Sequence, residues 1–359
     1  MAAHILLWMD GLEAVPPRGV APDLMVSPGS ALSSLSPLAP LLEFLGLPDL
    51  MPDPPLAALA ARYLGLASIP GAFWGRVEFT HLLQQRDRLL VLSPHRTGQT
   101  PHERSMLCQD LAPVLQADGH ACHGGDGGYP LLRLAGPVPG RPASLDVLMD
   151  ASLLDHLPLG RDDAPLRSII TTAQLVLARH PLNRERDQAG RMRLNTLWLS
   201  GLGALPESLA PQPLRAHHLC LAADPALLGA AALQGFATGR LSEDEPLEQW
   251  LTALIRHASG CALVYLGAPA LLARHGMVSE RDALLRQWLD ALLPALTGHG
   301  QGTLWLVGGA EWPVAGSPAA AQPRPVWVLG KPRKRRGLWR RAPATCSWEA
   351  LRRQWMVSG

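Results

Sequence analysis

The short segment Ser200-Gly201-Leu202-Gly203 has the composition of an anion-binding loop. It follows an apolar run, Leu194 to Leu199, that reads as a strand. Backbone N–H groups beside glycines can approach a phosphate closely. The segment lacks the GxxxxGK[ST] and GxGxxG patterns of nucleotide-binding loops, so we favour a tight turn at the end of the strand over a phosphate site.

Two polar residues before this loop could contribute to a ligand site. His180 ends a predicted helix, and Asn195 lies at the start of the predicted strand. Imidazole and amide groups can both donate and accept hydrogen bonds. A buried asparagine also needs partners of its own, so Asn195 could serve only to tie the strand to the preceding loop.

The densest cluster of positive charge lies between residues 331 and 341, with tryptophans close to it. Such a segment could neutralise phosphates and stack bases, but its position between a strand and the final helix also suits a solvent-exposed turn. We favour the exposed turn, so nucleic acid is not the expected partner. The basic residues are Lys331, Arg333, Lys334, Arg335, Arg336, Arg340 and Arg341.

A second candidate cluster consists of His120, Cys122 and His123, with Asp126 nearby. Imidazole and thiolate groups are zinc ligands, but the spacing lacks a paired CxxC or HxxxH pattern, and a glycine-rich hairpin explains the residues without a metal. Residues 217–220 contain two histidines and a cysteine at the start of a strand. Neighbouring side chains there point to opposite faces, which hinders shared coordination.

The chain has five cysteines among 359 residues. An odd count without CxxC pairs is typical of reduced thiols, so we expect no structural disulfide. The N-terminal apolar run, Ile5 to Met9, is too short for the core of a signal peptide, and no long apolar stretch suits a membrane span. We therefore expect a cytoplasmic protein.

Composition and periodicity predict the fold class. Hydrophobic residues make up 47% of the chain and charged residues 17%, with a formal net charge of +2. These values favour a globular protein with a sizeable core and do not call for a polyanionic partner. From Leu166 onward, helical segments alternate with apolar strands at 194–199, 218–222, 262–266 and 303–307. This alternation predicts an α/β fold with a mostly parallel sheet and helices on both faces.

The first part of the chain is less regular. Residues 1–150 contain strand-like runs at 89–92 and 129–134 and a helical segment at 103–117. We expect a mixed α/β region there, with residues 151–359 as an α/β domain that ends in the basic, tryptophan-containing segment. The opening strand, residues 4–10, could join the main sheet.

One segment, TTAQLVLARHPLNRERDQAGRMRLNTLWLSGLGALP, resembles the RpfE-type regulatory protein family of bacteria. The likeness is densest between residues 174 and 203, and shorter matches occur at 86–92, 223–235 and 335–341. The matching positions of the main segment are His180, Pro181, Asn183, Arg184, Glu185, Gly190, Asn195, Thr196, Leu197, Trp198 and Leu199.

That family is similar to cofactor-independent phosphoglycerate mutases, so the resemblance implies an alkaline-phosphatase-like fold. Enzymes of this kind clamp a phosphoryl group between two divalent ions and attack it with a serine or threonine. The run from Ile5 to Gly11 resembles their opening strand, which makes Asp10 the metal candidate. The remaining ligand motifs are missing. Gly-Ala-Pro at 267–269 follows the strand expected to supply Asp-x-x-x-His, with only His275 as a distant candidate, and Gly-Gly-Ala-Glu at 308–311 stands where Asp-His-Gly is expected.

We therefore expect a regulatory or accessory protein that is catalytically inert or weakly active and has no cofactor. The alternative is an active phosphoglycerate mutase or phosphatase that depends on Mn²⁺ or Mg²⁺, and a second alternative is nucleic-acid binding by the basic segment. The expected partner is another protein or a small phosphorylated ligand. The candidate ligand-binding residues are Asp10, His180, Asn183, Asn195, Trp198, Ser200, Gly201 and Gly203.

Overall fold

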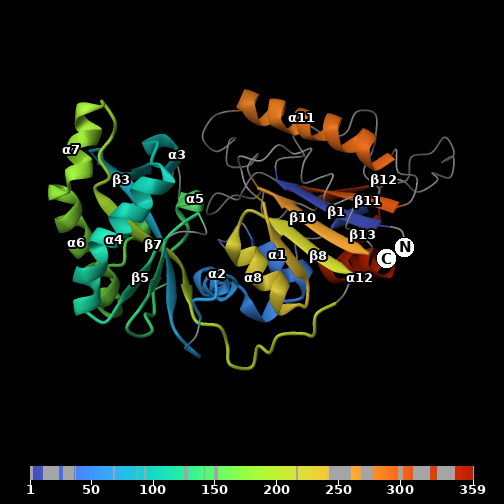
Figure 1. Ribbon diagram of the computed structural model, residues 1–359, viewed down its shortest axis with the longest axis horizontal. Coiled ribbons are helices and arrows are strands. Elements are labelled where there is room, and N and C mark those ends of the chain that lie inside the picture. The colour runs from blue at the N-terminus through green and yellow to red at the C-terminus, as the bar shows by residue number, and fades with distance from the viewer. Residues whose placement is uncertain are drawn as a thin grey trace. The chain divides into compact units, whose positions relative to one another are not determined.

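Strand β1 (Ala3–Asp10) lies inside an eight-stranded sheet (Figure 1). Residues 4–9 are all buried, as a continuous apolar strand covered on both faces should be. It pairs in parallel with β10 (Cys261–Leu266) on one side and with β11 (Gly302–Gly309) on the other. The opening strand therefore joins the main sheet, and the predicted parallel arrangement is confirmed.

The computed structural model divides the chain into two compact units. The first contains Met1–Met51, Pro211–Ala223 and Ala230–Gly359, and the second contains Pro52–Ala210 and Asp224–Gly229. This division differs from the expected boundary at residue 150, because the second unit is inserted into the chain of the first. The residues described are 3–10, 24–26, 36, 38–67, 69–86, 88–92, 94–124, 128–140, 142–148, 153–215, 217–241, 260–267, 278–297, 302–309, 324–329 and 344–358.

The other strands of the first unit extend its sheet on both sides. On the β10 side, β8 (His218–Ala222) and β9 (Ala237–Arg240) continue the parallel pairing. On the β11 side, β12 (Arg324–Leu329) runs antiparallel to both β11 and β2 (Leu24–Val26), and β13 (Ala344–Cys346) pairs in parallel with β2. The carboxyl ends of β1, β8, β10 and β11 therefore share one edge of the sheet.

Helices cover both faces of this sheet, which confirms the predicted α/β class. Figure 1 shows α11 (Val278–Thr297) on one face, with α1 (Ala39–Leu45) and α12 (Trp348–Ser358) on the other. The Trp355 indole N–H donates to the carbonyl of His4 over 3.1 Å. None of the described helices combines the length and the apolar character that crossing a bilayer would need.

The second unit contains a separate, antiparallel sheet of five strands. Its central strand is β3 (Trp74–Gln84), which the sequence patterns did not reveal. Strand β7 (Thr196–Gly203) pairs antiparallel with β3, so the prediction that this strand belongs to the parallel sheet is wrong. The other members are β4 (Leu89–Leu92), β6 (Leu131–Arg133) and β5 (Ala121–His123).

Helices α4 (Pro101–Ala117) and α6 (Ala164–Arg179) pack against one face of this sheet through a buried apolar cluster. Thr100 and Glu103 form a reciprocal capping box at the start of α4, which satisfies backbone donors that the first turn leaves unpaired. The remaining helical elements of the chain are η3 (Pro48–Leu50), α2 (Leu56–Tyr63), α3 (Pro94–Thr97), α5 (Leu145–Leu148), η4 (Leu153–His156), η5 (Arg161–Asp163), α7 (Pro181–Gln188) and α8 (Pro225–Leu233).

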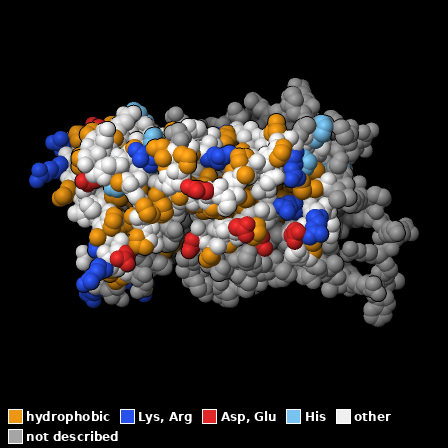
Figure 2. All heavy atoms as spheres, turned by 90° about the horizontal axis from the view of Figure 1, so that it is seen from below, with side chains coloured by type: hydrophobic (Ala, Val, Ile, Leu, Met, Phe, Trp, Pro, Cys, Tyr) orange, Lys and Arg blue, Asp and Glu red, His pale blue; other side chains and the backbone are white. Residues whose placement is uncertain are grey.

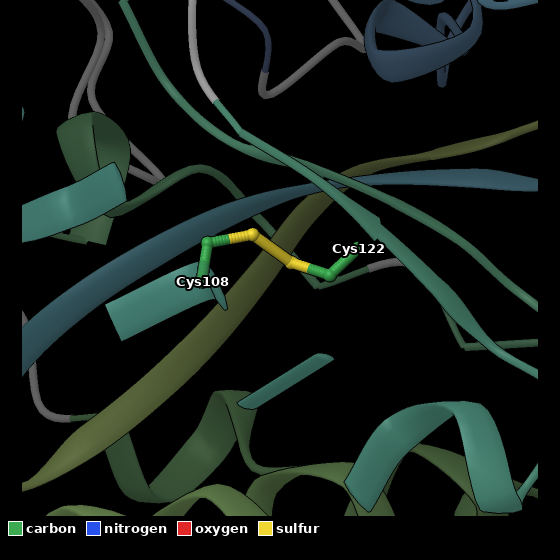
Figure 3. Close-up of a disulfide and its surroundings, with 2 residues drawn as sticks. All are labelled: Cys108 and Cys122. Atoms are coloured by element: carbon green, nitrogen blue, oxygen red, sulfur yellow. A yellow bond between two sulfur atoms is a disulfide. The ribbon is translucent and has the colours of Figure 1, made fainter. Parts of the chain in front are cut away.

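A disulfide joins Cys108 of α4 to Cys122 of β5, with Cα atoms 6.3 Å apart (Figure 3). The prediction of five reduced thiols is therefore wrong for this pair. The chain turns back after α4 and places β5 beside the helix, a proximity that no CxxC spacing signals. Cys220, Cys261 and Cys346 remain free thiols, and burial raises the pKa of Cys220 to about 12.

Candidate functional site

The glycines of the 200–203 segment bring β7 close to the start of α2. The strand continues through Gly203, so the predicted turn after Leu199 is wrong. Gly201 has a φ of +57°, and a Cβ there would lie 2.9 Å from the Cβ of Leu56. A Cβ on Gly203 would lie 2.6 Å from the Cβ of Pro55. Protein atoms therefore fill the space beside both glycines, and these contacts do not support an anion cradle.

Ser200 begins a chain of buried polar contacts, which we call the Ser200 cluster: Ser200, Glu78, Arg76, Tyr129 and Asp224. The Ser200 hydroxyl donates to Glu78 Oε2 over 2.7 Å, and Glu78 Oε1 lies 3.1 Å from the Arg76 guanidinium. That guanidinium stacks 4.2 Å above the Tyr129 ring. Tyr129 Oη then donates to Asp224 Oδ1 over 3.2 Å.

Burial controls the electrostatics at the Asp224 end of the cluster. It raises the pKa of Asp224, against the opposing charge of Arg76. Burial and the neighbouring Asp224 carboxyl also raise the pKa of Tyr129 well above its usual range. Asp224 Oδ1 accepts a second hydrogen bond, from the backbone N–H of Ala226 over 2.7 Å. Asp224 thus caps the first turn of α8 as well as binding Tyr129.

A carboxylate bonded to a serine hydroxyl can in principle take its proton and make the oxygen nucleophilic. Ser200 is only 1% exposed and Glu78 only 3%, so a substrate cannot reach the hydroxyl. Within the ranges described, no group of three His, Cys, Asp or Glu side chains is placed to hold a metal ion beside it. The Ser200 cluster therefore has the character of a structural polar network.

The sequence analysis missed Arg76, Glu78 and Tyr129. One signal was present, since Glu78 interrupts an otherwise apolar run in WGRVEFTHLL. A buried carboxylate requires a charged or hydrogen-bonding partner. Arg76, two residues away on the same strand, is one partner. Ser200 is the other, but it is 122 residues away in the chain, and its position depends on the β3–β7 pairing.

His180 and Asn183 both hold the junction between α6 and α7. His180 Nδ1 accepts from the backbone N–H of Leu182 over 3.2 Å, and Nε2 lies 2.8 Å from Asp110 Oδ2. Asn183 donates to the carbonyls of Leu177 and Leu194, at 2.7 and 2.8 Å. Its own Oδ1 accepts from the Leu194 N–H over 2.8 Å. The structure gives each of these two predicted ligand residues a structural role.

Asn195 and Trp198 are also occupied by contacts within the second unit. Asn195 Oδ1 accepts from the Leu82 N–H over 2.7 Å, and Nδ2 donates to the Leu82 carbonyl over 3.0 Å. These two hydrogen bonds resemble a backbone pair between antiparallel strands, so Asn195 links the start of β7 to β3. Trp198 is buried, and its indole N–H donates to the carbonyl of Ala143 over 2.9 Å.

Asp10 ends β1 at the edge where the parallel strands of the first unit finish. It stands opposite Gly309 of β11, and its predecessor Met9 stands opposite Leu266 of β10. Gly267 follows Leu266, so the positions flanking Asp10 on both neighbouring strands are glycines. Glycine offers no side-chain donor, so neither of these two described positions can supply a ligand to a paired metal site.

The structure also tests whether the second candidate cluster could bind zinc. Cys122 is bonded to Cys108, so it does not offer the free thiolate that zinc binds. His120 Nδ1 accepts from the Ala135 N–H over 3.1 Å, and the His123 ring packs 5.3 Å from that of Trp74. The zinc interpretation is therefore not supported.

His275 and the basic segment from Lys331 to Arg341 lie outside the described residues, and binding by that segment stays a prediction.

The surface of the described residues carries both positive and negative side chains. On the face that Figure 2 shows, basic, acidic and hydrophobic side chains are interspersed. A separate ion network stabilises the second unit: the buried Arg186 and the partly exposed Arg191 both bind the Glu103 carboxylate at 2.9–3.0 Å. These two arginines of the segment between residues 184 and 193 are thus engaged within their own unit.

The chain was compared with known proteins. No protein-family model matches it. A stretch of 55 residues, 15% of this chain, is 40% identical to a "probable 2,3-bisphosphoglycerate-independent phosphoglycerate mutase" of Geobacter sulfurreducens, and the match covers 14% of that protein.

The comparison with solved structures gave two matches of low sequence identity. The PH0037 protein from Pyrococcus horikoshii matches with a TM-score of 0.57 and 14% identity, over 91% of this chain and 87% of that one. A cofactor-independent phosphoglycerate mutase from Thermoplasma acidophilum matches with a TM-score of 0.44 and 15% identity, over 94% and 92% of the two chains. The likeness to the Pyrococcus protein shows a shared fold and nothing about activity.

Proposed function

We propose that this chain is a regulatory or accessory protein, built on a phosphoglycerate-mutase-like scaffold of the alkaline-phosphatase-like type, with little or no catalytic turnover. The observation that carries the proposal is the position of Asp10 between glycines at the carboxyl edge of the sheet. Two divalent ions held side by side need several carboxylate or imidazole ligands. Gly267 and Gly309 provide none.

The resemblance of residues 174–203 to RpfE-type regulatory proteins supports the regulatory part of the proposal. In this chain the segment builds α7, β7 and their junction, and its polar residues bind other parts of the same unit. A partner would therefore bind the folded surface of the unit. We expect either a protein or a small phosphorylated ligand.

An active phosphoglycerate mutase or phosphatase that uses Mn²⁺ or Mg²⁺ is the second candidate. The segment that is 40% identical to the Geobacter protein favours it. In that case Asp10 would be one of the ligands, and the others would come from residues outside those flanking it on β10 and β11.

An assay of 2- and 3-phosphoglycerate interconversion, with Mn²⁺ or Mg²⁺ added, separates the two candidates. We expect no turnover above that of a blank without protein. The matched variants are Asp10→Ala and Asp53→Ala, the latter at an exposed carboxylate. Turnover that Asp10→Ala abolishes and Asp53→Ala preserves would overturn the proposal.

A further inference from the structure

We propose that the Cys108–Cys122 disulfide is a reversible redox site, at which a dithiol reductant releases the edge strand β5 while the rest of the second unit stays folded. The inference is independent of the proposed function. It rests on where the two sulfurs lie and on what holds each of them in place.

The bond joins a core helix to the edge of a sheet. Cys108 is 1% exposed and sits on α4, whose Leu107, Leu111 and Leu115 belong to the main apolar cluster of the unit. Cys122 is half-buried and sits on β5, the last strand in the order β4-β3-β6-β5. Figure 3 shows the two side chains pointing toward each other from these elements.

Strand β5 has few other attachments within the sheet. Among the described residues it pairs only with β6, over three positions, and it is the last strand in the order. Short edge strands open more easily than central ones. Its neighbour β6 is part of the core, because it also pairs with β3 and places Leu132 in the apolar cluster, whereas Cys122 packs only at the margin of that cluster. Loss of the bond should therefore loosen β5 before the core.

The partial exposure of Cys122 decides which sulfur a reductant attacks. The thiolate of a dithiol attacks Cys122 Sγ, the S–S bond breaks, and the Cys108 sulfur leaves with the electron pair and takes up a proton. The second thiol of the reductant then attacks the mixed disulfide. It releases Cys122 as a thiolate and leaves the reductant as a disulfide, so that two electrons have passed to the protein.

A fixed positive charge lies beside this strand. Arg133 stands opposite Ala121 in the register of the hairpin. Its charge adds to burial in lowering the pKa of His120, two residues before Cys122, and of His123, directly after it. The same charge favours the thiolate that Cys122 becomes on release.

Release of β5 should also uncover Trp74. This tryptophan is 1% exposed and packs on the ring of His123, which belongs to β5. Its indole would gain contact with water when β5 moves away, and its fluorescence should shift to longer wavelength. The Trp74→Phe variant identifies this signal among those of the other tryptophans.

The test combines thiol counting with hydrogen exchange on the full chain. Without reductant, the denatured protein should show three free thiols, those of Cys220, Cys261 and Cys346; after dithiothreitol it should show all five. Exchange in peptides covering β5 should then quicken by roughly tenfold or more, while α6 peptides stay unchanged. The double variant Cys108→Ser, Cys122→Ser should match the reduced protein, and Cys220→Ser should respond like the native chain.

Three results would overturn the inference. Five free thiols before reduction would mean that the bond does not form. Unchanged exchange in β5 after both thiols are freed would mean that the bond does not hold this strand. An equal rise in exchange of α6 would mean that the bond staples the whole unit. All three are read on the native chain, so the test stands even if the double variant fails to fold.

Discussion

Replacement of Asn183 by alanine tests the structural role assigned to this residue in place of ligand binding. The amide makes three hydrogen bonds, two of them to the backbone of Leu194 and one to the carbonyl of Leu177. The Leu177 carbonyl also accepts from the His180 N–H over 3.2 Å, so it keeps one partner in the variant. The Leu194 N–H and carbonyl lose theirs.

The expected loss of stability follows from the unpaired N–H and carbonyl of Leu194. Leu194 is fully buried, so water cannot take the place of the lost amide. A buried backbone group without a partner costs about 1–3 kcal/mol, so the two together should lower the free energy of unfolding by about 4 kcal/mol. A ligand-binding residue on an open surface would cost far less.

Urea unfolding followed by circular dichroism measures this loss. Asn195→Ala is the matched comparison, because its two bonds to Leu82 are only partly buried and water can replace them. We expect that variant to lose about 1 kcal/mol. If Asn183→Ala loses no more than Asn195→Ala, the assignment of Asn183 as a buried structural tie is wrong.

Two further predictions concern the second unit. Burial acts to raise the pKa of Glu103, but hydrogen bonds from the Thr100 backbone and from two arginines lower it overall. Glu103 therefore contributes its full stabilisation above the ordinary pKa of 4.5. This contribution is lost as the pH falls through the lower pKa of the folded state. Acid titration of unfolding should show this loss in the native chain and not in Glu103→Gln, and equal acid sensitivity of the two would refute it. Gly201→Ala should destabilise by about 2 kcal/mol more than Gly190→Ala, since both have positive φ but only Gly201 faces Leu56. Equal losses in thermal melts would show that the contact with Leu56 is unimportant.

The sequence predicted those elements whose apolar pattern is continuous and local. The strands at 89–92 and 218–222 match β4 and β8, and the helix at 103–117 lies within α4 (Pro101–Ala117). The spacing of apolar residues within each segment is enough to identify the face that the element buries. The α/β class followed from the same alternation.

The parts that could not be predicted depend on contacts distant in the chain. β3 mixes apolar with polar residues, and its Glu78 binds Ser200, which only the β7 pairing brings to it. Similarly, the two halves of the disulfide meet because β5 folds back on α4. The polar residues of the 180–200 segment are buried by their own unit. Residue types alone could not show this, because the same groups would serve a ligand site.

The metal content of the purified chain tests the central claim most directly. After incubation with excess Mn²⁺ and removal of the free ion, elemental analysis of the native protein, of Asp10→Ala and of the exposed control Asp53→Ala should give the same substoichiometric value. A pair of tightly bound ions per chain that is lost in Asp10→Ala and kept in Asp53→Ala would contradict the account.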